Sequence, residues 1–319
     1  MPQENQENKA KKKTSIGGQA LIEGVMMRGP QKTAMAVRHV SGEIVMEEFS
    51  NGISKGMKAV RKIPLVRGVV NMVESMVLGY RCLMRSAEMA GLEEEEESGK
   101  EEKPQSKAEA FFISLLMVLS TVVGIVLAIV LFIFLPAFLY GLITKAVPSM
   151  ENRLWRSIFE GLIRIVLFVA YMLLVSLMKD IRRVFRYHGA EHKTIFCYEA
   201  GEELTVENVR KQSRFHPRCG TSFLVLMLLV GIIVSMFISI TNPFWRTLVK
   251  ILTIPLMVGI GYELIKWAGR SDSLLSRIIS KPGMWMQRIT TKEPDDSMIE
   301  CAIAALKAVI PDDPEADRW

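Results

Sequence analysis

The run FFISLLMVLSTVVGIVLAIVLFIFLPAFLYGL, at residues 111–142, sets the fold class of this 319-residue chain. It contains no charged residue and is longer than the roughly 20 residues that an α-helix needs to cross a bilayer. Pro136 is expected to bend or end the helix, because proline removes a backbone donor and clashes with the preceding turn. The sequence therefore predicts an α-helical integral membrane protein.

Three further apolar runs follow at residues 157–178, 222–240 and 248–265. The first carries Glu160 and Arg164 one helical turn apart, and we expect this pair to neutralise itself. The last carries Pro255 and Glu263, which favours a bent span or a re-entrant segment. For Glu263 we expect a partner in Lys266, a metal or an arginine of the central loop, because an unpaired carboxylate is costly in a membrane. The total is about four transmembrane or re-entrant helices.

Basic residues predict the orientation of these helices. The 179–221 loop holds nine Lys and Arg residues, whereas the 142–156 and 241–247 loops hold three and one. Cytoplasmic loops are enriched in Lys and Arg, so both termini and the 179–221 loop are expected on the cytoplasmic side. The same rule explains the net charge of +6 by basic segments that lie at the surface of a lipid bilayer. No specific nucleic-acid partner is therefore predicted.

The flanking segments complete the domain plan. A β-hairpin is expected from the short runs 33–40 and 43–49, joined at Ser41-Gly42, and a helical apolar period covers 65–89. A second amphipathic helix is expected from 297 to 309, where Ser297 and Glu300 have capping-box spacing, and it should dock on the N-terminal domain or the central loop. The predicted units are a disordered basic tail (1–13), a cytoplasmic β-hairpin with an amphipathic helix (14–90), an acidic flexible linker (91–108), a transmembrane pair (109–178), a cytoplasmic loop rich in His, Cys and Glu (179–221), a second transmembrane or re-entrant pair (222–268) and a cytoplasmic C-terminal segment (269–319).

Scarce residues concentrate in the 179–221 loop. If residues 187–199 are helical, His188 and His192 project from one face and Glu191 lies on the same side. The order His-x-x-Glu-His is that of the inverted zinc-peptidase motif, in which two imidazoles hold zinc and the carboxylate handles a proton of the metal-bound water. Downstream, His216 and Cys219 offer further ligands. We therefore predict a divalent metal site, with zinc as the expected ion and Glu191 as the catalytic base.

Alternatives remain open at this stage. Cys219 or His216 would be the third ligand of a catalytic site, whereas Cys197 and Cys219 together would close a tetrahedral structural site. A thiol mechanism would instead use Cys197 or Cys219 activated by His216. Without metal, Glu191 would simply pair with an arginine in the lipid headgroup layer, namely Arg182 or Arg186.

Several motifs resemble the YqhQ-type family of bacterial membrane proteins. They are GGQALIEGVMMRG at 17–29, IPLVRG at 63–68, HGAEH at 188–192, FHPRCGTS at 215–222 and EPDD at 293–296. The resemblance covers most of the chain from Gly17 to about Val309. It implies a bacterial membrane location and a metal-dependent enzyme without an assigned substrate.

Two functions follow as expectations. The first is a metal-dependent hydrolase that acts on a membrane-associated substrate, using His188, His192, His216 and Cys219 as metal ligands and Glu191 as base. The second is a non-enzymatic accessory protein of a membrane complex that inserts, assembles or degrades other membrane proteins, with a structural metal or none. Phosphate loops, dinucleotide glycine fingerprints and nucleophile elbows are absent from the sequence.

Overall fold

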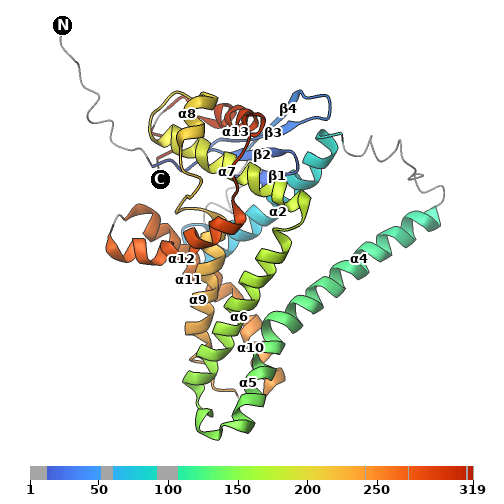
Figure 1. Ribbon diagram of the computed structural model, residues 1–319, viewed down its shortest axis with the longest axis vertical. Helices are drawn as coiled ribbons and strands as arrows, with labels where there is room; N and C mark the ends of the chain where they lie inside the picture. The colour runs from blue at the N-terminus through green and yellow to red at the C-terminus, as the bar shows by residue number, and fades with distance from the viewer. Residues whose placement is uncertain are drawn as a thin grey trace.

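The computed structural model describes residues 13–51, 60–91, 107–240, 242–271, 273–313 and 315–318. Figure 1 shows a sheet-containing part above a group of apolar helices, with α2 (Val66–Met89) lying across the boundary between them. The predicted basic tail and acidic linker fall almost entirely outside the described residues.

A four-stranded antiparallel sheet forms the N-terminal unit. Its strands β1 (Gly17–Leu21), β2 (Gly24–Arg28), β3 (Lys32–Arg38) and β4 (Ile44–Ser50) lie in sequence order. The predicted hairpin is confirmed as β3–β4, and Gly42 in its turn has a φ of +91°, which glycine adopts without strain. Sequence patterning missed β1 and β2, because the Gly-rich and Met-rich runs GGQAL and GVMMR lack a clear alternation of apolar and polar residues.

Both faces of the sheet are covered. Met27 and Val25 point into one core with α7 (Lys179–Glu199) and α13 (Asp296–Val309), whereas Met26 points into a second core with α2. Side chains alternate between faces along a strand, so a strand with successive buried residues must be covered twice. The sheet is thus the middle layer between α2 on one side and α7 with α13 on the other.

Helix α2 confirms the predicted helix at 65–89 but turns an unexpected face inward. It buries small residues such as Gly68, Gly79 and Ser86 against the rest of the molecule. Its large apolar side chains Met76 and Tyr80 are 65% and 66% exposed. Small residues allow close approach of the backbone, so α2 packs tightly while leaving an apolar stripe uncovered.

The apolar helices make the chain mostly helical. They are α4 (Lys107–Ile129), the π-helical η1 (Val130–Phe134), α5 (Leu135–Ala146), the short 3₁₀ turn η2 (Pro148–Met150), α6 (Arg153–Val175), α9 (Gly220–Ser235), α10 (Pro243–Leu252) and α11 (Ile254–Arg270). Two helical stretches, Phe111–Ala146 and Arg153–Val175, are long and apolar enough to cross a membrane. Helices α10 and α11 form a bent pair, at 43°, that counts as a third candidate, and α9 is apolar but shorter.

Charged residues among these helices have partners that sequence spacing did not indicate. Glu160 accepts hydrogen bonds from Arg156 and Lys250, and its expected partner Arg164 donates instead to the Phe132 carbonyl at 2.8 Å. That carbonyl belongs to η1, where the wider π-helical turn alters the regular backbone pairing.

Glu263 likewise has a different partner from those expected. Arg67 of α2, which is neither Lys266 nor an arginine of the central loop, donates to both Glu263 oxygens. This contact joins α2 to α11 across the boundary between the sheet-containing part and the apolar helices.

The remaining helices bring the C-terminal segment back to the sheet. Helices α8 (Val206–Lys211) and α12 (Leu274–Thr290) precede α13 in the chain. The docking predicted for the C-terminal helix is confirmed, because α13 buries its apolar side against β2, β3 and α7. Its N-cap is Asp295, whose side chain accepts from the Met298 amide at 3.1 Å, rather than Ser297.

Candidate metal centre

The middle of α7 supplies most of the site. The helix expected at 187–199 is confirmed within Lys179–Glu199, although Gly189 is a weak helix former. A Cβ at Gly189 would collide with the carbonyl oxygen of Lys292, which crosses α7 there, and the Lys292 amide donates to the Phe185 carbonyl at 2.8 Å. Glycine is therefore required by the crossing of the α12–α13 connection over the site.

Three potential ligand atoms converge beside α7. One atom each of His188, His192 and Cys219 lies within 4.8 Å of the others. The Nε2 atom of His188 is 3.2 Å from the Cys219 sulfur, and the two imidazole centroids are 4.4 Å apart. In a tetrahedral zinc site, bonds of about 2.0–2.3 Å bring ligand atoms to within roughly 3.5 Å of one another. Small side-chain movements suffice to reach that spacing.

Backbone carbonyls orient both imidazoles. The Nδ1 atom of His188 lies 2.9 Å from the Thr290 carbonyl oxygen, and that of His192 lies 2.6 Å from the Arg214 carbonyl oxygen. A carbonyl oxygen only accepts, so each Nδ1 carries a proton, and each Nε2 is directed toward the centre of the cluster, where it can bind a metal ion once it is unprotonated. Such a second hydrogen bond is the usual support of a metal-ligating histidine.

Electrostatics favour an ionised thiol in the cluster. Burial by itself would raise the pKa of Cys219, but the nearby His188 and His192 rings outweigh it and hold the pKa well below its ordinary value. Burial would likewise lower the pKa of His188, yet the Cys219 thiolate raises it to about 9. A thiolate is the form of cysteine that binds metal, so the donor set fits a soft or borderline cation.

Glu191 lies beside the three ligands with an unsatisfied oxygen. Its side chain is only 5% exposed, and Oε2 is buried with no hydrogen-bond partner among the described residues. Burial raises the pKa of this carboxyl group, although His188 and His192 act in the opposite direction. The carboxylate is therefore free to bind a proton or a water at the cluster, unlike a carboxylate used to tie two helices together.

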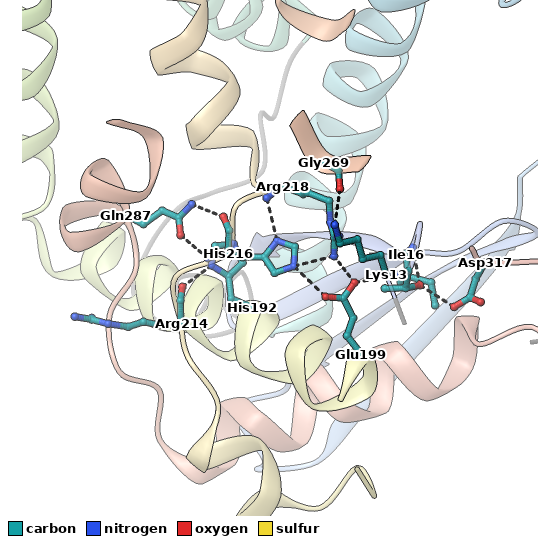
Figure 2. A network of polar contacts seen from close by, with 11 residues as sticks. Lys13, Ile16, His192, Glu199, Arg214, His216, Arg218, Gly269, Gln287 and Asp317 are labelled. Carbon is teal, nitrogen blue, oxygen red and sulfur yellow. Dashed lines mark hydrogen bonds and ion pairs between the residues drawn. The ribbon is translucent and has the colours of Figure 1, made fainter. Parts of the chain in front are cut away.

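His216 belongs to a neighbouring network instead of the three-atom cluster. Figure 2 shows its ring directed toward Glu199 and Arg218, with Gln287 bound to its backbone. Its Nδ1 accepts from the Arg218 amide at 3.3 Å, and its Nε2 faces the Glu199 carboxylate at 3.7 Å. Both ring nitrogens are thus engaged, and the His216 ring centroid is 5.5 Å from that of His192.

The Glu199 network holds the ligand-bearing loop in place. Arg218 also pairs with Glu199, and the Gln287 amide both donates to the His216 carbonyl and accepts from its amide at 2.7 Å. Burial would raise the pKa of Glu199, but the His216 hydrogen bond and the Arg218 charge lower it overall. His216 therefore fixes the loop that ends at Cys219.

Other sequence alternatives lie apart from the cluster. Cys197 lies in the apolar core, where burial raises the pKa of its thiol to about 11. It is not part of the cluster that contains Cys219. Arg186 pairs with Asp295 at 3.0 Å, and no arginine among the described residues bonds the buried Oε2 of Glu191. The imidazole next to Cys219 is that of His188, and not His216 as a thiol mechanism had anticipated.

A cavity of about 600 Å³ opens onto the cluster. Its walls come from β1, from α2, from α7 and from the loop before α9, and they include Gly18, Met76, Tyr80, Glu191, Cys219 and Leu224. This volume is within the range of small-molecule binding pockets, roughly 300–1,000 Å³. The candidate centre is thus accessible from the boundary between the sheet and the apolar helices.

Sequence reasoning missed the strand that faces Glu191. A Cβ on Gly18 would lie 2.8 Å from the Glu191 Cγ, so glycine is needed for β1 to pass this side chain. The Gly18 amide also lies close enough to the carboxylate to favour its ionised form and so to lower its pKa. The pair Gly17-Gly18 was the available signal, but two adjacent glycines are more typical of a turn than of a strand.

Fold and site together define a mostly helical protein with candidate membrane spans, a small antiparallel sheet and a buried His-His-Cys cluster. The model of DUF1385, a family of proteins of unknown function, matches residues 63–312. The uncharacterized protein YqhQ of Bacillus subtilis (strain 168) is 33% identical over 306 residues, which cover 95% of this chain and 94% of that protein. The chain belongs to this family, as its sequence motifs predicted. No solved structure matches it.

Proposed function

We propose that this chain is a multi-pass bacterial membrane protein with a metal-dependent hydrolase centre on its cytoplasmic face. His188, His192 and Cys219 are the metal ligands, Glu191 is the base, and the substrate is associated with the membrane. Zinc is the expected ion, because mixed imidazole and thiolate ligands suit it and three protein ligands leave a position open for water.

The observation that carries this proposal is the buried Glu191 oxygen without a partner beside three convergent ligand atoms. Buried polar atoms are nearly always hydrogen-bonded, so an exception next to a cavity calls for a ligand. A structural site closed by Cys197 is disfavoured, because Cys197 lies in the apolar core and is not among the converging ligand residues. Three ligands, a free carboxylate and an open cavity are the parts of a hydrolytic site.

The chemistry divides between the ion and the chain. A bound zinc ion would supply a water of lowered pKa and would polarise the bond to be broken. Glu191 takes the proton from the attacking water and delivers it to the leaving group. The carbonyls of Thr290 and Arg214 keep both imidazoles oriented, while Gln287 and Glu199 hold the loop that carries Cys219.

The membrane placement rests on apolar surface and charge. Helices α4 to α6 supply the candidate spans, and α2 presents exposed Val73, Met76 and Tyr80 at the junction, as expected for a helix in the membrane interface. The excess of basic residues at 179–221 supports a cytoplasmic location for the cluster and both termini. A cavity floor that includes Leu224 of α9 suits a membrane-associated substrate.

Metal analysis of the purified protein tests the ligand set. We expect about one zinc per chain in the full-length protein in mild detergent, and a loss of most of it in His192→Ala and Cys219→Ser, because each removes one of three ligands. His39→Ala is the matched control, since His39 hydrogen-bonds only Ser41 among the described side chains and lies outside the cluster. A wild type without stoichiometric metal, or a His192→Ala protein that retains it, refutes the proposal.

A non-enzymatic accessory role is the second candidate. The apolar stripe of α2 and the exposed apolar side chains of α4 favour it, because uncovered apolar surface on a protein marks contact with a membrane or a partner. Complementation of a deletion strain separates the two functions. Glu191→Gln abolishes growth rescue if the centre is catalytic and preserves it if metal only stabilises the fold.

A further inference from the structure

Strand β1 is an edge strand, and its outer edge faces the cavity. The sheet order places β1 at one end, with only β2 beside it. Backbone bonds from Arg38 to Glu23 and from Gly29 to Lys32 fix which residues of β2 point toward β3. Gly24 and Met26 therefore point toward β1 and exchange hydrogen bonds with Leu21 and with Gln19.

The alternate residues of β1 consequently turn their backbone groups outward. Gly18 and Ala20 are these residues, and the Gly18 amide does reach the Glu191 carboxylate on that side. The Gly18 carbonyl and both backbone groups of Ala20 have no hydrogen-bond partner within the described part of the chain. Along the cavity wall the strand thus offers the Gly18 carbonyl as an acceptor, the Ala20 amide as a donor and the Ala20 carbonyl as a second acceptor.

The residues of this strand carry none of the sequence features that usually protect a sheet edge. Natural edges carry lysines, prolines or bulges that prevent another strand from pairing. The segment Gly17–Leu21 contains none of these, and a Cβ on Gly17 would meet no atom within 4 Å. In Figure 1, β1 lies near both α7 and α2, whose side chains also line the cavity.

We infer that the substrate is an extended polypeptide segment that pairs with the outer edge of β1 and places its scissile amide beside Glu191. This inference rests on the proposed hydrolase function. An added strand satisfies the Gly18 carbonyl and both Ala20 groups at once, and main-chain pairing of this kind is an established mode of peptide recognition. Met72, Met76 and Leu224 on the cavity wall suit apolar side chains.

The cavity chemistry disfavours other occupants. Among the described residues Arg218 is the lysine or arginine in the wall, and it is paired with Glu199, so a phosphate group would depend on the proposed metal ion alone for its counter-charge. A lipid tail has no donor for the Gly18 carbonyl. In peptide hydrolysis the water oxygen bonds to the carbonyl carbon, the carbon–nitrogen bond breaks, and the proton accepted by Glu191 passes to the leaving nitrogen.

N-methyl scanning tests the pairing directly. The probes are fluorescein-labelled peptides of alternating valine and threonine, about six residues long as in an ordinary strand. Each carries one N-methyl group at a different position, and binding to full-length Glu191→Gln protein in detergent is followed by fluorescence polarisation. We expect methylation to weaken binding about fivefold to tenfold at alternate positions and to have little effect between them, because only every second amide faces β1.

Two variants give an independent readout. Ala20→Pro removes the outward backbone donor and should weaken peptide binding about fivefold to tenfold. The fold should tolerate this change, because proline is accepted at an edge where the amide bonds no neighbouring strand. Ala20→Ser, which keeps the donor, is the control. Gly17→Leu fills the cavity from a position with free space and should weaken binding without lowering the unfolding temperature. Binding unaffected by both variants overturns the inference.

Metal content measured on the same samples separates the two proposals. Three results overturn the strand pairing even when zinc is bound. They are absence of peptide binding, equal effects of methylation at all positions, and displacement of the peptide by phosphatidylglycerol micelles with no alternation. Alternating effects in a protein without zinc support the pairing and refute the metal centre.

Discussion

Two buried glutamates of this protein, Glu191 and Glu160, differ in how their charge is compensated. Glu160 is 1% exposed and accepts from Arg156 and Lys250, with Arg246 at 3.6 Å. Glu191 is 5% exposed, and one of its oxygens has no hydrogen-bond partner among the described residues. A carboxylate whose oxygens are all hydrogen-bonded stabilises the packing of helices, whereas one with an unbonded oxygen beside a cavity is available for chemistry.

The geometry of the two regions explains the difference. Glu160 joins α6 to α10 through cations that come from both helices, so its removal leaves buried positive charge. Glu191 contacts β1 through the Gly18 amide and otherwise faces ligand atoms and the cavity. Burial alone therefore does not identify a functional residue. The two glutamates are distinguished by whether each buried carboxylate oxygen has a hydrogen-bond partner.

The largest effect expected from this comparison is on activity. Glu191→Gln should reduce hydrolysis of unfolded polypeptide by about 100-fold to 10,000-fold, the usual contribution of a general base. Glu160→Gln should leave the rate per folded molecule unchanged. Initial rates with fluorescein-labelled casein, normalised to folded protein, measure both. Equal losses in the two variants would remove the functional distinction between the clusters.

The next effect is on stability and runs the opposite way. Glu160→Gln should lower the free energy of unfolding by about 3–5 kcal/mol, because Lys250 and Arg156 lose their counter-charge in a buried site. Glu160→Gln combined with Lys250→Met should recover part of the loss, since one unpaired cation is removed with the carboxylate. Thermal unfolding in detergent measures these changes. A stable Glu160→Gln protein contradicts the structural role.

The smallest effect concerns pH and the Glu199 network. The pKa of Glu199 is lowered in the folded protein, so its stabilising contribution is present above the ordinary carboxyl pKa and is lost as the pH falls through the lowered value. Glu199→Gln should cost about 3 kcal/mol at neutral pH, and its deficit should shrink below about pH 4.5. Unfolding temperatures of both proteins between pH 7 and pH 3.5 measure the deficit, and a constant difference would contradict the assignment.

Sequence periodicity predicted the elements whose pattern is local. The β3–β4 hairpin, α2 and the C-terminal helix follow from turn residues and apolar spacing, and the apolar runs mark the candidate spans. Strands β1 and β2 escaped because the face that each buries depends on helices distant in sequence. The same dependence hid the outward apolar face of α2.

The part of the candidate site that depends on the spacing of residues along one helix was predictable from the sequence. The i and i+4 positions of His188 and His192 put both rings on one face of α7, and residue type named Cys219 as a further ligand. His216 could not be separated from Cys219 by sequence, because the two lie three residues apart and their directions depend on contacts with Glu199 and Gln287.

The sequence by itself determined the family, the apolar helices and the pairing of two histidines with one glutamate on a single helix, because each is encoded in residues close along the chain. Tertiary structure alone decided that one oxygen of Glu191 lacks a hydrogen-bond partner among the described residues, that His216 lies with Glu199, and that the edge of β1 borders the cavity. Those features depend on burial and on contacts between residues far apart in sequence, which local spacing does not specify.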